Sequence, residues 1–139
     1  MIPTIQTLMS KSLSAIDAAK SVEEAAEQMA RLRTGSLLVR RDDDFVGMIT
    51  DVDIVRKAVA KRLKPSRLRV EEVMSAPLIT IRTDQSILEA NALMEKHHLR
   101  HLGVTQFGRV VGVVSVRDFL HPILIQESPE APRKGARAS

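Results

Sequence analysis

The chain has 139 residues, enough for one compact unit with a hydrophobic core. It contains three Phe and no Trp, Tyr or Cys, so aliphatic side chains and Met must build that core. The shortage of aromatic rings argues against a stacking platform for single-stranded nucleic acid, and the absence of Cys excludes disulfides, thiol nucleophiles and thiolate metal sites.

The distribution of charged residues along the chain is more informative than the net charge. The net charge is +4, and basic residues concentrate in residues 56–69 and in the C-terminal tail. A solvated helix face explains such a stretch, and a patch that binds a polyanion is the alternative. No apolar run has the length of a signal-peptide core or a membrane span. We therefore predict a soluble, cytoplasmic protein without a membrane partner.

The first half of the chain predicts a short β segment, a helix, two strands and a closing helix. Ser21 is the expected N-cap of the first helix, and Gly35 is expected to end it. Residues 36–40 and 45–50 are the expected strands. The three Asp at 42–44 form the expected turn rather than a metal site.

The closing helix begins near Asp53, and Pro65 is expected to end it, which places the join between the halves around residues 61–69. The second half predicts the same order of elements. Its helix and strands are expected at the following positions: N-cap Ser86, strands 100–105 and 110–115, and a turn at 106–109.

The two halves are copies of one unit. A shift of 65 residues aligns residues 9–53 with 74–118 without a gap, and 13 of the 45 positions are identical, against about three expected by chance. The predicted division is repeat 1 at 1–65, repeat 2 at 66–126 and a disordered tail at 127–139. We expect an α/β (α+β) fold in which two β-α-β-β-α repeats pack sheet to sheet with pseudo-twofold symmetry, leaving two clefts.

Each repeat carries the motif G-x-x-T/S-x-x-D. Its members are Gly47, Thr50 and Asp53, and then Gly112, Ser115 and Asp118. The hydroxyl and the acid fall in the first turn of a helix, where free N–H groups favour an anion. A carboxylate can accept two hydrogen bonds from a vicinal diol, and the hydroxyl can hold a phosphate oxygen, which suits a ribonucleotide. The alternative is structural: the same residues form helix capping boxes.

The doubled motif, the strands GSLLV and RHLGV and the entry VMSAPLITI resemble the CBS (cystathionine-β-synthase-type) domain family, over about residues 5–125. The resemblance implies a disc-shaped pair, called a Bateman module, that commonly forms a homodimer. It also implies binding of AMP, ADP, ATP, S-adenosylmethionine or a similar adenosyl ligand, with no required cofactor and no catalytic residues.

The resemblance further implies the composition of the two clefts, because each takes the hydroxyl and acid of one repeat and two strands of the other. Cleft A would comprise Thr50, Asp53, Ile79, Thr80, Arg100, His101, Leu102 and Gly103. Cleft B would comprise Ser115, Arg117, Asp118, Ser14, Ile16, Gly35, Ser36, Leu37 and Leu38. In cleft A, Asp53 would hold the ribose and Thr50 the phosphate.

Two positions depart from the family pattern. Gly103 stands where a proline is frequent, and Ala15 occupies the position that Thr80 holds in the other repeat. Cleft B therefore lacks one polar partner, and we rank cleft A first. His98, Arg100 and His101 are candidates for positive charge beside phosphates. His97, His98 and His101 are expected to be helix-end histidines favoured by the helix dipole rather than metal ligands.

We expect a non-enzymatic regulatory module that binds an adenine nucleotide or S-adenosylmethionine and signals to a partner protein by conformational change. The partner's identity stays open. One alternative is a ligand-free structural or dimerisation module. The other is a nucleic-acid-associated protein that uses residues 56–69, although nucleic acid is not the partner we favour. The apolar residues available for self-association or for the core are Ile54, Val55, Val59, Phe119, Leu120, Ile123, Leu124 and Ile125.

Overall fold

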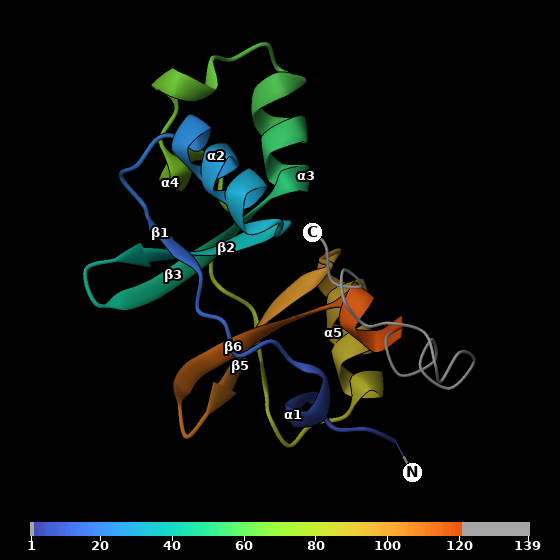
Figure 1. The fold of residues 1–139 in the computed structure, drawn as a ribbon. Coiled ribbons are helices and arrows are strands. Elements are labelled where there is room, and N and C mark those ends of the chain that lie inside the picture. Colours follow the sequence, from blue (N-terminus) through green and yellow to red (C-terminus); the bar gives the residue numbers. More distant parts are fainter. Residues whose placement is uncertain (1, 121–139) are drawn as a thin grey trace. The chain divides into compact units, whose positions relative to one another are not determined.

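The computed structural model of the chain describes residues 2–120. Met1 and residues 121–139 lie outside this range, and with them the predicted tail at 127–139. Over residues 2–120 the fold is mixed α+β with two three-stranded sheets, which confirms the predicted fold class (Figure 1). No helix in this range is long and apolar enough to cross a lipid bilayer.

The described chain forms two compact units. The first unit comprises residues 13–78, and the second comprises residues 2–12 together with 79–120. This division cuts the chain elsewhere than the sequence repeat does. The segment that precedes the first strand of each repeat folds onto the sheet of the other repeat.

The first unit contains a sheet of strand order β1-β2-β3, with β1 parallel to β2 and β2 antiparallel to β3. Its strands are β1 (Ala15–Asp17), β2 (Ser36–Arg41) and β3 (Asp44–Thr50). The predicted turn at 42–44 is one residue too long, because Asp44 already pairs with Arg41. Asp42 adopts a φ of 56°, a left-handed conformation that Asp tolerates better than most residues.

Helices cover one face of this sheet (Figure 1). They are α2 (Val22–Leu32), α3 (Asp51–Ile54), the π-helix η1 (Val55–Val59), the 3-10 helix η2 (Pro65–Arg67) and α4 (Val70–Val73). The helix after β3 thus ends at Val59, so Pro65 begins η2 and does not end the helix as predicted.

The predicted cap of α2 is confirmed. The Ser21 hydroxyl accepts a hydrogen bond from the Glu24 N–H at 3.0 Å, and the Glu24 carboxylate accepts one from the Ser21 N–H at 2.9 Å. The helix ends before Gly35, because Arg33 takes a left-handed conformation with a φ of 55° and forms the C-cap.

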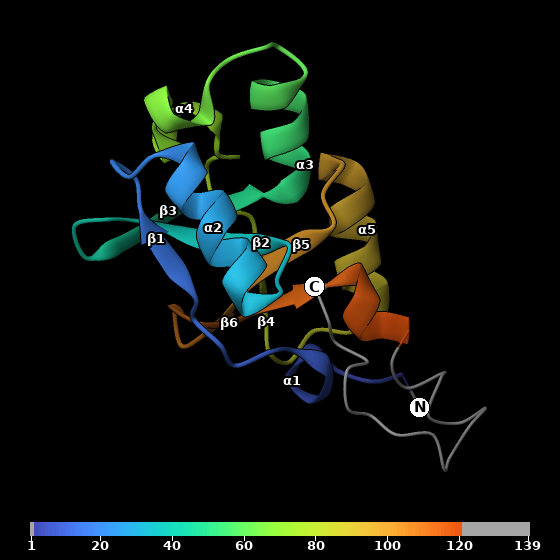
Figure 2. The ribbon, with the colours of Figure 1, turned by 45° about the horizontal axis from the view of Figure 1, so that its top comes forward.

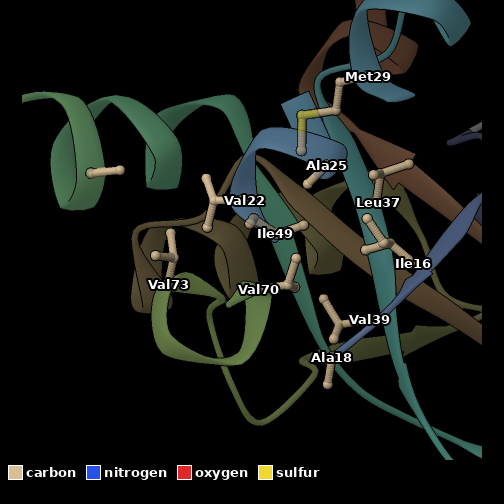
Figure 3. Packing of buried hydrophobic residues seen from close by; sticks show 11 residues of the cluster. Ile16, Ala18, Val22, Ala25, Met29, Leu37, Val39, Ile49, Val70 and Val73 are labelled. Atoms are coloured by element: carbon tan, nitrogen blue, oxygen red, sulfur yellow. The ribbon is translucent and has the colours of Figure 1, made fainter. Parts of the chain in front are cut away.

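The core of the first unit lies between its sheet and its helices. Figure 3 shows its members, Ile16, Ala18, Val22, Ala25, Met29, Leu37, Val39, Ile49, Ala58, Val70 and Val73. Each is aliphatic or Met, as the composition predicts. The side chains of Ile16 and Leu37, which the sequence assigns to cleft B, are therefore buried in the core, and only their backbone groups remain for a ligand.

The second unit repeats this plan with strand order β4-β5-β6. Its elements are α1 (Ile5–Leu8), β4 (Thr80–Arg82), α5 (Ile87–His97), β5 (His101–Gln106), β6 (Arg109–Ser115) and helical residues 116–120. Figure 2 shows α5 and the helix at 116–120 side by side. Ile5 and Phe119 are buried in the core of this unit, so Phe119 does not belong to an exposed apolar surface.

Gly47 lets the segment before β4 cross strand β3. Ser75 exchanges two backbone hydrogen bonds with Met48, at 2.8 and 3.0 Å. A Cβ at Gly47 would lie 2.6 Å from the carbonyl oxygen of Ser75, so any side chain there would push the segment away. Gly112 does the same for Ser10 in the second unit, where the approach is closer still.

Candidate functional site

Thr50 and Asp53 form the turn that leads from β3 into α3. The Thr50 hydroxyl accepts a hydrogen bond from the Asp53 N–H at 3.1 Å, and Asp53 Oδ2 accepts one from the Thr50 N–H at 3.1 Å. This is the capping box that the sequence offers as the structural alternative. The box also holds the carboxylate in one orientation, which a ligand-binding acid requires as well.

Asp53 is buried, with 6% of its surface exposed. The Ser75 hydroxyl donates to its carboxylate, with the two oxygens at 3.0 and 3.2 Å. Lys57 Nζ lies 3.0 Å from Oδ1. Burial of an unpaired carboxylate is costly, and these two contacts offset part of that cost.

Lys57 lies in η1 and contacts both α3 and α4. It follows Asp53 by one helical turn, and its ammonium also donates to the carbonyl oxygen of Val73 at 3.1 Å. An ammonium group has three N–H donors, so among the described residues two are engaged and one remains. The side chain is 41% exposed, which leaves the remaining donor within reach of solvent or a ligand.

The second unit holds its motif differently. The Ser115 N–H donates to Asp118 Oδ2 at 2.8 Å, and the Ser115 hydroxyl lies 3.4 Å from the same oxygen. Asp118 is 4% exposed. The position that corresponds to Lys57 is Pro122, so the second repeat has no lysine one turn after its acid.

The entry and middle strands that the sequence assigns to the clefts are joined in the same way in both units. The Leu38 N–H donates to the Ser14 carbonyl at 3.0 Å. The Gly103 N–H donates to the Ile79 carbonyl at 3.0 Å, and the parallel pairing continues from Thr80. Each of these carbonyl oxygens thus accepts a hydrogen bond within its own unit.

The hydroxyl residue of each motif lies opposite the start of the neighbouring strand. The register pairs are Ser36 with Thr50 and His101 with Ser115. The Gly35 carbonyl accepts a hydrogen bond from the Asp51 N–H, the first of the helix after β3, at 2.9 Å. The Arg100 carbonyl accepts one from the Val116 N–H, the first of the helix after β6, at 3.0 Å. Leu102 points into the core of the second unit, as Leu37 does in the first, so it too offers a ligand only backbone groups.

The structure therefore brings Thr50 to Asp53, and Ser115 to Asp118, each pair within one unit. Arg117 is exposed beside the second pair. Clefts A and B each draw on residues of both units, so their assembly from these halves stays a prediction.

The histidines occupy the end of α5 and the start of β5. His97 is the last residue of α5, His98 is its C-cap with a φ of 57°, and His101 begins β5. Across residues 2–120 no three His, Cys, Asp or Glu side chains gather as a metal site.

Sequence reasoning missed Lys57 and Ser75. Lys57 has a signal, because its spacing of four residues from Asp53 is the spacing of a helical ion pair. The sequence instead places it in the basic stretch. Ser75 lies 22 residues from Asp53, and only the crossing of its segment over β3 brings the two together.

The basic stretch is exposed. Its side chains without a described ion pair are Arg56, Lys61, Arg62, Lys64 and Arg67. Beside it, Val55 and Val59 are 56% and 59% exposed, next to an apolar groove of about 570 Å³ between α2 and α3. Of the residues expected to support self-association, Leu120 is exposed as well, and Ile123 to Ile125 lie outside the described residues.

The family model described as "CBS domain" matches the chain twice, at residues 5–60 and 70–124. The chain therefore belongs to the CBS domain family. CBS domains generally bind adenosine ligands, and proteins built from CBS pairs are often regulatory, generally non-catalytic and commonly oligomeric.

Several relatives are similar over most of this chain. Protein MJ0450 of Methanocaldococcus jannaschii is 31% identical over 79% of the chain, which spans only 58% of that relative's length. Hypoxic response protein 1 of Mycobacterium tuberculosis is 30% identical, with 83% of this chain and 81% of that protein covered.

Solved structures agree with the fold. A CBS-domain protein of Burkholderia ambifaria, described as a candidate for signal transduction, aligns with a TM-score of 0.85 at 29% identity, covering 90% and 96% of the two chains. The structure of Hypoxic Response Protein I, which contains two coordinated zinc ions, aligns with a TM-score of 0.72 at 30% identity, covering 86% and 98%.

Proposed function

We propose that the chain is a regulatory module that binds an adenine nucleotide or S-adenosylmethionine and passes the signal to a partner protein. Asp53 and Asp118 bind ribose hydroxyls, and Thr50 and Ser115 help to bind phosphate. The observation that carries the proposal is the duplicated, buried acid in the first turn of a helix, in a chain of a family that binds adenosine ligands.

The capping geometry supports this assignment. A capping box alone needs no burial, and the corresponding acids at the start of α2 and α5 are exposed residues, Glu24 and Glu89. Among residues 2–120, Asp53 and Asp118 are the acids that the fold buries. Burial of a charge is expensive even where contacts compensate it in part, and a ligand-binding role for these two acids is in keeping with that cost.

Calorimetric titration with AMP, ATP and S-adenosylmethionine tests the proposal. Binding of at least one of them well below millimolar concentration, lost in the double variant Asp53→Asn, Asp118→Asn, is the expected result. Absence of binding by all three would leave the ligand-free dimerisation module as the better description. Sedimentation of the unliganded protein then shows whether the exposed Val55 and Val59 serve self-association.

The exposed cations of residues 56–69 favour one second candidate, binding to the nucleic-acid backbone. Fluorescence anisotropy with a short DNA duplex decides this. Affinity that falls steeply between low and physiological salt, and that disappears when Arg56, Arg62 and Arg67 are changed to Gln, supports it. A chain that binds no duplex at low salt has no such function.

A further inference from the structure

Lys57 places a cation next to the buried carboxylate of Asp53. Its ammonium lies 3.0 Å from Asp53 Oδ1 and 3.1 Å from the carbonyl oxygen of Val73. The carboxylate and the ammonium together carry no net charge. One turn after Asp118 the residue is Pro122.

An acid that binds ribose beside a phosphate faces an electrostatic problem. Ribose hydroxyls donate well to a carboxylate. The phosphate of a nucleoside monophosphate, however, carries about −1.5 to −2 charges at pH 7 and is repelled by the carboxylate. The repulsion acts strongly at a buried carboxylate, because the effective dielectric constant there is lower than in water. A cation bound to the same carboxylate cancels most of this repulsion.

Lys57 is placed to be that cation. It is held by contacts on two sides, so its charge stays next to Asp53 before any ligand arrives. Its partial exposure keeps the cost of burying the ammonium low. The competing explanation is structural: Lys57 would merely join η1 to the end of α4 through Val73.

We propose that Lys57 is the specificity-determining residue of the Asp53 half of cleft A, and that it selects phosphorylated adenosine over the uncharged nucleoside. This inference rests on the proposed function, because an adenosyl ligand must bind at Asp53. It adds the class of ligand, a nucleoside with an anionic phosphate, and a residue outside the duplicated motif.

The test compares AMP with adenosine by calorimetry. The parent protein carries Asp118→Asn, which confines binding to the Asp53 half, and Lys57→Met and Lys57→Arg are made in it. The parent is expected to prefer AMP by tenfold or more. In Lys57→Met this preference should shrink by about tenfold, since only the phosphorylated ligand loses a favourable charge. Lys57→Arg keeps the charge and should keep the preference.

The outcomes distinguish failure of the role proposed for Lys57 from failure of the proposed function. If Lys57→Met weakens AMP and adenosine by the same factor, the lysine is structural and the inference is overturned. If the parent binds AMP and adenosine equally, the proposed function stands and the inference alone fails. If the parent binds neither, the inference fails, and titration of the unchanged chain with AMP, ATP and S-adenosylmethionine then decides the proposed function separately. Circular dichroism checks folding, and Lys57→Gln replaces Lys57→Met if the latter does not fold.

Discussion

Asp53→Ala is expected to lower the free energy of unfolding by about 2–3 kcal/mol. The change removes the acceptor of the Ser75 hydroxyl and of the Thr50 N–H, and each lost bond at this depth costs about 1 kcal/mol. The ion pair with Lys57 contributes at most about 0.5–1 kcal/mol, because the ammonium is partly exposed and stays hydrated without its partner.

Urea denaturation followed by far-ultraviolet circular dichroism measures this loss, since the chain has no Trp or Tyr to report by fluorescence. Asp84→Ala is the matched control: Asp84 also pairs with a basic residue, Arg82, but both are exposed, so the expected change is below about 0.5 kcal/mol. If Asp53→Ala and Asp84→Ala destabilise equally, Asp53 does not hold the buried contacts described above.

Three further outcomes follow from the contacts. Ser75→Ala should cost about 1 kcal/mol of stability yet raise AMP affinity severalfold, because it frees an acceptor of Asp53; unchanged affinity by calorimetry contradicts this. Gly47→Ala should destabilise by more than about 2 kcal/mol, because a Cβ there would lie 2.6 Å from the carbonyl oxygen of Ser75; a melting temperature equal to that of the unchanged chain refutes it. The hydrogen bond from the N-cap backbone N–H lowers the pKa of Glu24, so its stabilising contribution is present above the unfolded pKa and lost as pH falls through the folded pKa. Glu24→Gln should therefore flatten the acid limb of a stability-versus-pH curve, and an unchanged limb counts against the capping bond.

Much of each repeat is readable from local sequence. The caps of α2 and α5 are both present as S-x-x-E, and both form complete boxes in the structure. The strand pairs were located to within one residue, because alternating apolar residues on either side of a short turn leave few registers. The same local rules identified Thr50 and Asp53 as the turn after β3.

The assignment of segments to sheets was beyond local sequence. Helices α1 and α4 are one short turn each, too short to give a periodic signal, and each packs on the sheet of the other repeat. Their buried residues, Ile5 and Val70, occupy equivalent positions 65 residues apart, but equivalence does not say which core each one enters. The Ser75 contact to Asp53 forms only if the segment after α4 packs on the sheet of the first repeat. The sequence does not specify this packing, so the contact could not be predicted from it.

The contacts of Asp53 determine how a ligand can act on this fold. A carboxylate offers about four acceptor positions, and Thr50, Ser75 and Lys57 already donate to three. A vicinal diol brings two donors, so one present donor must leave. The Thr50 N–H is fixed by the helix cap, and Lys57 is fixed by its second contact to Val73, whereas the Ser75 hydroxyl needs only to rotate.

Loss of the Ser75 hydrogen bond is therefore the donor exchange that costs least free energy. It affects the segment in which Ser75 lies. Ser75 lies in the segment that leaves α4, crosses β3 and continues directly into β4 of the second unit. A ligand can shift a conformational equilibrium only by as much as it interacts differently with the two states. Here the difference is one hydrogen bond, about 1 kcal/mol. Occupancy of Asp53 alone therefore changes the equilibrium constant between two positions of this segment by no more than about fivefold. A larger response would require contacts from the second unit to the same ligand, which is what cleft A predicts.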